Sequence, residues 1–264
     1  MSTPRAFEPT ADPELDAALS RLTDPDRDVR QAAALDLGTA ADPAGAPGLV
    51  ARLWSEPDPF VRDTLSWAVT RVADAATPLL LDALAGTDTT SRVRALHVLS
   101  KIADPATTSA IVPLAGDDDA DVAAKARWAL ARTGDPRAVP ALVALLGTGD
   151  STVRNGLTRD LASFDRTAVP SLVMALTRDE TPARHHAAEV LCFIGPGAED
   201  ATGALAEALQ DTDEDVRLSA AMALYDLRTR TALAVLARYT EADDPRLRAI
   251  ARRPQALGSP GQVT

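Results

Sequence analysis

The sequence predicts an all-α fold, a right-handed α-solenoid of about eight helix-turn-helix repeats, and three observations predict it. A small or apolar residue followed by arginine recurs at intervals of 30 to 33 residues, and one repeat, at Val122-Ala123, lacks the arginine. An acidic residue stands three positions before each pair, and apolar residues follow it at helical spacing. Such intervals are typical of stacked repeats, each of which buries its apolar face against its neighbours.

The composition also favours helices. Hydrophobic residues make up 46% of the 264 residues but aromatic residues only 3%, so we expect a core of alanine, leucine and valine. Small apolar side chains suit closely packed helices better than sheets. The single cysteine excludes an intrachain disulfide, no apolar run reaches the length of a membrane span, and the N-terminus lacks the apolar core of a signal peptide. We therefore expect a cytoplasmic protein.

The recurring pair lies in the second helix of each repeat, and its first residue is defined here as position zero. The seven complete pairs are Val29-Arg30, Val61-Arg62, Ser91-Arg92, Val153-Arg154, Ala183-Arg184, Val216-Arg217 and Leu247-Arg248. A short acidic side chain three residues earlier can accept hydrogen bonds from the first turn of the helix. These predicted caps are Asp26, Asp58, Asp88, Asp119, Asp150, Glu180, Asp213 and Asp244. Apolar residues at +4, +7, +8 and +11 then follow the 3.6-residue period of a helix.

The first helix of each repeat is predicted by an apolar stretch before the acidic residue. Aspartate as a cap with proline at the first helical position is a start signal, and it occurs at Asp42-Pro43, Asp104-Pro105 and Asp135-Pro136. Three further prolines either begin these helices or kink them, namely Pro47, Pro140 and Pro170. The repeats cover residues 13–253 as one domain. Residues 1–12 and 254–264 are rich in proline, glycine, serine and threonine, and we expect them to be flexible tails.

Two segments of this pattern, AVPALVALLGTGDSTVR and DTDEDVRLSAAMALYDL, resemble HEAT repeats, especially the short bacterial type of phycobilin-lyase-like proteins. The resemblance extends over roughly residues 13–253. It implies that the second helices line a concave surface and that arginine and aspartate residues bridge neighbouring repeats. The arginines in this position are Arg30, Arg62, Arg92, Arg154, Arg184, Arg217 and Arg248. The fold is a generic scaffold, so the resemblance indicates architecture and not function.

Position +6 of the second helix points away from the core, yet Trp67, His97 and Trp128 occupy it in three successive repeats. Tryptophan and arginine dominate the energetics of protein interfaces. We therefore predict a non-enzymatic scaffold that binds a partner protein or peptide on the concave surface of its second helices. The proposed contacts are Trp67, His97, Trp128, Arg159, Glu189, Met222 and Tyr225. If the register were off by one residue, the tryptophans would instead fill the core between repeats.

A second hypothesis is an enzyme or small-molecule carrier with its pocket in the groove of the concave surface, lined by His97, His185 and Cys192. The segment ARHHAAEVLCFIG is similar to a motif of deoxyhypusine hydroxylase, a HEAT-repeat enzyme with a di-iron centre. That family needs His-Glu pairs in several repeats and this sequence has none, so we expect no metal or cofactor. His185-His186 is interpreted as a surface pair. Cys192 as a nucleophile would need His185 as its base.

Nucleic-acid binding is a third hypothesis, which the formal charge of −11 disfavours because phosphates repel an acidic surface. Its core would be Arg127, Trp128 and Arg159, with tryptophan stacking on bases. Only two of the 27 basic residues, Lys101 and Lys125, are lysines, which we interpret as genomic codon bias.

Overall fold

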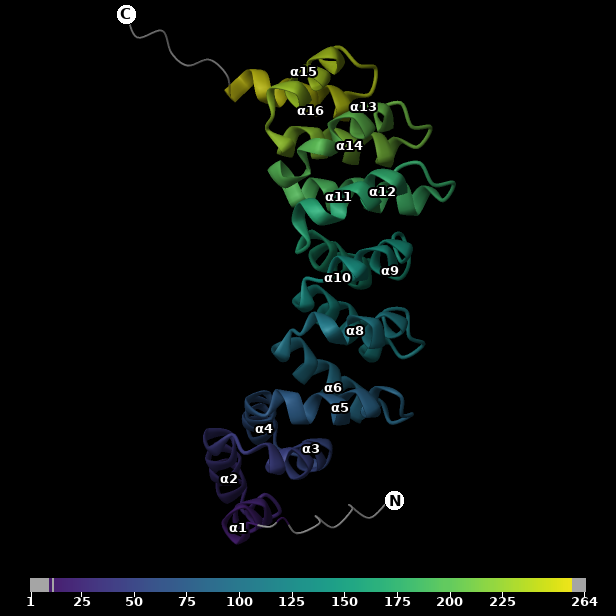
Figure 1. Cartoon of the computed structure of the whole chain (residues 1–264). Coiled ribbons are helices and arrows are strands. Elements are labelled where there is room, and N and C mark those ends of the chain that lie inside the picture. Colours follow the sequence, from purple (N-terminus) through teal and green to yellow (C-terminus); the bar gives the residue numbers. More distant parts are fainter. Residues whose placement is uncertain (1–9, 11, 258–264) are drawn as a thin grey trace, which may run out of the picture. The chain divides into compact units, whose positions relative to one another are not determined.

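The computed structural model describes Thr10 and residues 12–257, with side chains up to Arg253, and this part of the chain contains helices and no strands. The chain forms two compact units, which meet in the sequence at Thr133 and Gly134. Each unit contains four pairs of helices, so the expected eight repeats are confirmed (Figure 1). The helix α16 runs through residues 254–257, which the sequence assigned to a tail.

The N-terminal unit contains the first four repeats. Its helix pairs are α1 (Pro13–Arg21) with α2 (Arg27–Ala40), η1 (Pro43–Gly45) and α3 (Ala46–Ser55) with α4 (Pro59–Arg71), α5 (Ala73–Leu84) with α6 (Thr89–Ile102), and η2 (Pro105–Thr107), α7 (Thr108–Ile111) and η3 (Val112–Leu114) with α8 (Ala120–Thr133). The second helices lie side by side, α2 against α4, α4 against α6 and α6 against α8.

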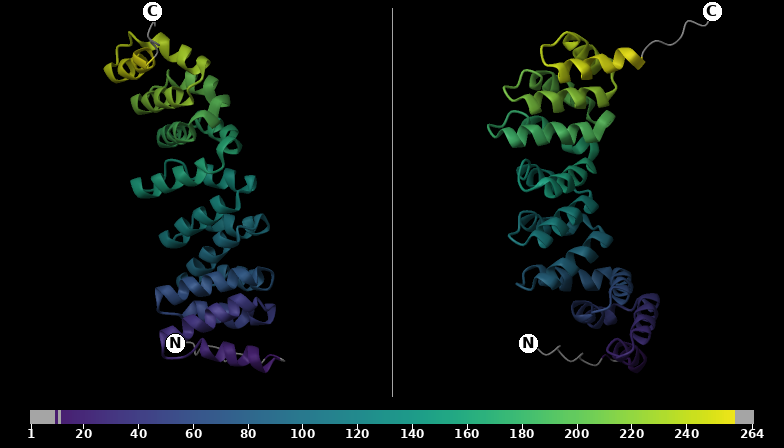
Figure 2. Two further views of the ribbon diagram at one scale, coloured as in Figure 1. Left: turned by 90° about the vertical axis from the view of Figure 1, so that its left-hand side faces the viewer. Right: turned by 180° about the vertical axis from the view of Figure 1, so that it is seen from behind.

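The C-terminal unit repeats this arrangement. Its pairs are η4 (Pro136–Ala138) and α9 (Val139–Ala144) with α10 (Ser151–Ala162), η5 (Asp165–Ala168) and α11 (Val169–Ala175) with α12 (Thr181–Ile194), η6 (Gly195–Ala201) and α13 (Thr202–Ala208) with α14 (Glu214–Leu227), and α15 (Arg230–Leu236) and η7 (Ala237–Tyr239) with α16 (Pro245–Leu257). Here α10 packs against α12, α12 against α14 and α14 against α16. Figure 2 shows the pairs of each unit as successive layers.

The acidic caps form at seven of the eight predicted positions. Each aspartate accepts backbone N–H bonds from the first turn of its helix, as Asp58 does from Phe60 and Val61. The prediction is wrong for Glu180, whose side chain makes no such bond. Its extra methylene carries the carboxylate away from the helix end, which is why shorter acidic side chains are preferred there.

The first helices also begin as predicted. The three Asp-Pro pairs each start a 3₁₀ turn, and each aspartate accepts a bond from the N–H two residues later. Pro47, Pro140 and Pro170 then occupy the second position of α3, α9 and α11, so they begin these helices and do not kink them. A proline N–H is not needed there, since the first turn lacks acceptors for it anyway.

The core consists of the small apolar residues that the spacing selects. In α14 the residues at +4, +7, +8 and +11, which are Ala220, Ala223, Leu224 and Leu227, are at most 1% exposed. Burial of a leucine side chain stabilises the fold by about 1.5–3 kcal/mol. Each helix pair therefore holds its neighbours mainly through this apolar face.

The recurring arginines bind the turn of their own repeat more consistently than they bridge to the next one. The guanidinium groups of all except Arg92 donate to carbonyl oxygens in the turn before their own helix. Bridges to a carboxylate of the following repeat form in three cases, which are Arg30–Glu56, Arg92–Asp117 and Arg184–Asp211. The expectation that every arginine bridges repeats is therefore met in these three alone.

Whether an arginine bridges to the following repeat depends on one residue of that repeat, which lies five positions before its position zero. Glu56, Asp117 and Asp211 occupy this position in the bridged cases, whereas after Arg62, Arg154 and Arg217 it holds Gly86, Arg178 and Ala242. The side chain of Glu56 is fully buried. Burial raises its pKa, but hydrogen bonds from Arg30, from the Asp58 N–H and from Arg52 outweigh this and lower the pKa to about 2.

Candidate partner-binding surface

Two tryptophans lie exposed on the second helices of the N-terminal unit. Trp67 on α4 and Trp128 on α8 are 38% and 37% exposed, and His97 on α6 between them is half-buried. We call these three residues the aromatic row. The helical register predicted from the sequence places them on the face of the second helices that points away from the core, which we call the outer face. Their exposure excludes the alternative that they fill the core between repeats.

Trp67 is held in place by a close approach to the preceding second helix. A Cβ atom on Gly38 of α2 would lie 2.4 Å from Cζ3 of Trp67 and 2.9 Å from Cα of Ala68. The glycine therefore lets α4 approach α2 and provides the surface on which one side of the indole rests. The role of Gly38 depends on contact between two helices, so the sequence of one repeat does not reveal it.

Trp128 is held by two neighbours from α6 and α8. Its ring stacks on His97 at 5.9 Å between centroids and 18° between planes, and Nζ of Lys125 lies 4.5 Å from its centroid. Burial, followed by the charges of Lys101 and Lys125, lowers the pKa of His97. The imidazole is thus neutral at pH 7. Lys101 in turn pairs with Asp63 of α4 at 2.8 Å.

The C-terminal unit carries the other four predicted contacts. Arg159 on α10 and Glu189 on α12 are exposed, and Met222 and Tyr225 on α14 are half-buried. Arg253 of α16 lies over the last two, with its guanidinium carbon 6.0 Å from the Tyr225 ring centroid and its Nη1 3.6 Å from Sδ of Met222. Arg253 also occupies position +6, but the predicted set of contacts omitted it.

The paired histidines differ sharply in their surroundings, and the prediction of a surface pair is wrong for one of them. His186 is 1% exposed. Its Nδ1 accepts the N–H of Gly147 at 3.1 Å, and its Nε2 lies 2.9 Å from the hydroxyl oxygen of Thr158, to which it donates in this tautomer. Burial lowers the pKa of His186 to about 4. A neutral imidazole therefore joins α12 to α10 and to the turn before it.

Cys192 and His185 do not form a nucleophile and its base. The Cys192 thiol donates to Oδ2 of Asp226 at 3.2 Å, and burial together with this carboxylate raises the pKa of the thiol to about 12. A thiolate is the reactive form of cysteine, so this group is poorly nucleophilic. The Nε2 atom of His185 lies 3.8 Å from Oε1 of Glu189.

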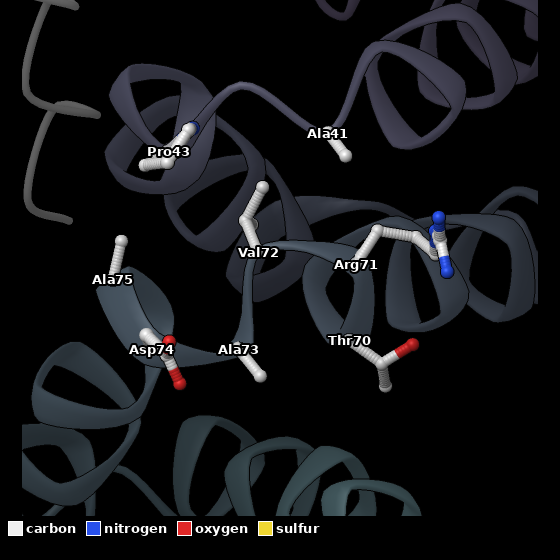
Figure 3. Close-up of a pocket in the computed structure, with 8 residues that line it drawn as sticks. All are labelled: Ala41, Pro43, Thr70, Arg71, Val72, Ala73, Asp74 and Ala75. Atoms are coloured by element: carbon white, nitrogen blue, oxygen red, sulfur yellow. The ribbon is translucent and has the colours of Figure 1, made fainter.

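A surface hollow of about 510 Å³ lies in the N-terminal unit, where α4 meets α5 (Figure 3). It is lined by Ala41, Pro43, Thr70, Arg71, Val72, Ala73, Asp74 and Ala75, so the residues proposed for a ligand pocket do not contribute to it. In the part of the chain that the structure describes, no three histidine, cysteine or acidic side chains are placed to hold a metal ion. No helix in that part combines the length and the hydropathy required to cross a bilayer.

The repeat pattern matches the family model of HEAT repeats over residues 15–98, 77–162 and 167–253. The chain belongs to the HEAT-repeat family. No curated protein sequence matches it. Among solved structures, this HEAT-repeat chain is similar to the karyopherin Kap95p in a structure with RanGDP, with 14% identity, a TM-score of 0.58 and coverage of 91% of this chain and 40% of that one.

Other solved HEAT-repeat proteins match over most of their length. Human deoxyhypusine hydroxylase is 22% identical, with a TM-score of 0.39 and coverage of 92% of this chain and 95% of that one. The CpcE–CpcF complex of phycocyanin lyase from Nostoc sp. PCC7120 is 22% identical, with a TM-score of 0.43 and coverage of 89% and 96%. Both TM-scores lie below 0.5, so the structural similarity that supports the fold is the one to the karyopherin, with a TM-score of 0.58.

Proposed function

We propose that this HEAT-repeat chain is a cytoplasmic, non-enzymatic scaffold that binds a partner protein or peptide on the outer face of its second helices. The observation that carries this proposal is the exposure of Trp67 and Trp128 at equivalent positions of two helices. Tryptophan is among the residues that contribute most to binding energy at protein interfaces. In a chain with 3% aromatic residues, two exposed indoles on one face favour a role in contact.

The surroundings of both indoles support this proposal. Trp67 rests on Gly38, and Trp128 is held by His97 and Lys125. A side chain that is already fixed loses little conformational entropy when a partner binds, so more of its contact energy contributes to affinity. We further propose Arg159, Glu189, Met222 and Tyr225 of the C-terminal unit as contacts.

The karyopherin structures support a protein partner by analogy of fold. Kap95p was solved with RanGDP, and Kap121p, at a TM-score of 0.54 and 14% identity, was solved bound to the extreme C-terminus of the phosphatase Cdc14p. The chain covers 40% and 32% of those two proteins. The hypothesis of an enzyme or ligand carrier gains no such support, since the Cys192 thiol is held protonated and the hollow in the N-terminal unit is lined by none of His97, His185 and Cys192.

A pull-down from the native cell lysate tests the proposal. The tagged wild type is compared with a Trp67→Ala/Trp128→Ala variant by mass spectrometry, and a Phe60→Ala/Phe193→Ala variant serves as the control. The two phenylalanines are 68% and 63% exposed but lie outside the aromatic row. We expect a protein that the wild type and the phenylalanine variant capture and the tryptophan variant does not.

Two results would contradict the proposal. One is capture of the same proteins by all three forms, because the indoles would then contribute nothing to binding. The other is a large drop in the melting temperature of the tryptophan variant, measured by circular dichroism, since the indoles would then be structural.

A further inference from the structure

A row of basic residues runs parallel to the aromatic row, one helical turn further along each helix. Arg71, Lys101 and Arg132 occupy position +10 of α4, α6 and α8, four residues after Trp67, His97 and Trp128. Residues four apart lie on the same face of a helix. We call these three residues the basic row. Both lysines of the chain lie at this surface, Lys101 in the basic row and Lys125 against Trp128, which codon bias alone does not explain.

Most of the positive charge on this face has no carboxylate partner. Arg71 and Arg132 are exposed, and neither forms an ion pair or side-chain hydrogen bond with the part of the chain that the structure describes. Lys125 likewise has no carboxylate partner among those residues and lies over the Trp128 ring. Arg94 donates only to the carbonyl oxygens of Leu53 and Trp54.

Two carboxylates offset part of this charge. Asp74, which follows α4, lines the same hollow as Arg71. Asp63 pairs with Lys101 at 2.8 Å, and its side chain is 75% exposed. The outer face of α4, α6 and α8 is therefore positive, although the whole chain carries a formal charge of −11. A positive face around exposed aromatic residues, on a chain whose net charge is negative, favours negatively charged partners and speeds their association.

The spacing of the helices fits an extended chain. Packed helices lie about 8–10 Å apart, and an extended peptide advances about 3.3 Å per residue, so roughly seven residues cross the three helices. Alternate side chains of such a segment point in opposite directions. A segment lying across the helices can thus reach the aromatic row with some side chains and the basic row with others.

We propose that the partner segment bound by the N-terminal unit is an acidic, extended peptide. Its apolar side chains contact the aromatic row, and its carboxylates pair with the basic row and with Lys125. This inference rests on the proposed function and specifies the chemistry of the partner. A single-stranded nucleic acid is the less favoured occupant, because a phosphate recurs at every nucleotide and would meet Asp63 on this face, whereas a peptide can place an uncharged residue there.

Selection of peptides from a random dodecapeptide display library on the full chain tests the inference. We expect the enriched sequences to contain several aspartates or glutamates around one or two large apolar residues. Fluorescence anisotropy with a labelled selected peptide then measures affinity. We expect an Arg71→Glu/Arg132→Glu variant to bind it at least about tenfold more weakly. Replacement of the acidic residues of the peptide by lysine should restore binding to that variant.

The control is Arg230→Glu/Arg238→Glu in the C-terminal unit, which changes the net charge equally at two exposed arginines and should bind the acidic peptide as the wild type does. Neutral or basic selected peptides, no selected peptides, or equal affinity in both charge variants overturns the acidic partner. Tighter binding of a labelled single-stranded oligonucleotide than of the acidic peptide overturns it as well. If the charges have no effect but Trp67→Ala/Trp128→Ala abolishes binding, the proposed function stands while this inference fails.

Discussion

The buried His186 should cause the C-terminal unit to lose stability as the pH falls from 6.5 towards 4. In the unfolded chain the imidazole has its ordinary pKa of 6.5, whereas burial lowers its pKa in the folded protein to about 4. Between these values the unfolded chain binds a proton that the folded chain does not. The free energy of unfolding therefore decreases with falling pH, and above pH 6.5 His186 causes no such loss.

The size of the effect follows from the two pKa values. One unit corresponds to about 1.4 kcal/mol, so the complete loss below pH 4 is roughly 3.5 kcal/mol. The loss should reach about 1.4 kcal/mol at pH 5.5 and about 2.5 kcal/mol at pH 4.5. This is a large fraction of the stability of an ordinary domain, which is about 5–15 kcal/mol.

Urea unfolding followed by far-ultraviolet circular dichroism, at several pH values between 7.5 and 4.5, measures this loss. His186→Gln removes the titrating group, and His185→Gln is the matched control, since His185 is half-exposed on the adjacent position. We expect the wild type and the His185 variant to lose stability in parallel, and the His186 variant to lose about 2.5 kcal/mol less by pH 4.5. Carboxylates that titrate in this range affect all three forms equally and cancel in the comparison.

One result would contradict a neutral, buried His186 in the folded protein. If the His186 variant and the wild type lose stability with the same slope, the folded protein does not keep this imidazole neutral. Loss of the bond to the Gly147 N–H should also make the His186 variant less stable by about 1–3 kcal/mol at pH 7.5.

Three further predictions concern packing and reactivity. A Gly38→Ala substitution should lower the melting temperature and change the intrinsic fluorescence, because the new methyl group displaces Trp67 and the backbone of α4. Glu56→Gln should destabilise the N-terminal unit by about 3–5 kcal/mol in urea unfolding, since the buried Arg30 loses its countercharge; an unchanged midpoint would show that the pair is unimportant. Iodoacetamide should alkylate Cys192 far more slowly at pH 8 than it alkylates a free thiol, as followed by mass spectrometry, because the thiol stays protonated.

The periodicity of the sequence predicts the fold, and the register chosen from it favours exposed indoles. Capping, proline positions and the 3.6-residue spacing are local properties, and they place Trp67 and Trp128 on the outer face without knowledge of any neighbouring helix. The failure at Glu180 is also local, because one methylene decides whether a side chain reaches its own helix end.

Properties that depend on two repeats at once could not be predicted in this way. Whether an arginine bridges repeats depends on the residue that occupies a turn of the next repeat, as Arg184 and Asp211 show. The burial of His186 depends on contacts with Thr158 and Gly147, 28 and 39 residues away. Its helical position alone did not predict this burial, because the equivalent position is half-buried in six of the other seven repeats and buried only at Ile250.

The three arginine–carboxylate bridges have a consequence for the order in which the chain folds during synthesis. Arg30, Arg92 and Arg184 precede their carboxylates by 26, 25 and 27 residues. Each arginine leaves the ribosome well before the group that neutralises it, so these helix pairs become fully stable only when the next turn has emerged. The nascent chain is thus expected to become stable in steps of two repeats at these three places, with single unpaired repeats as short-lived intermediates.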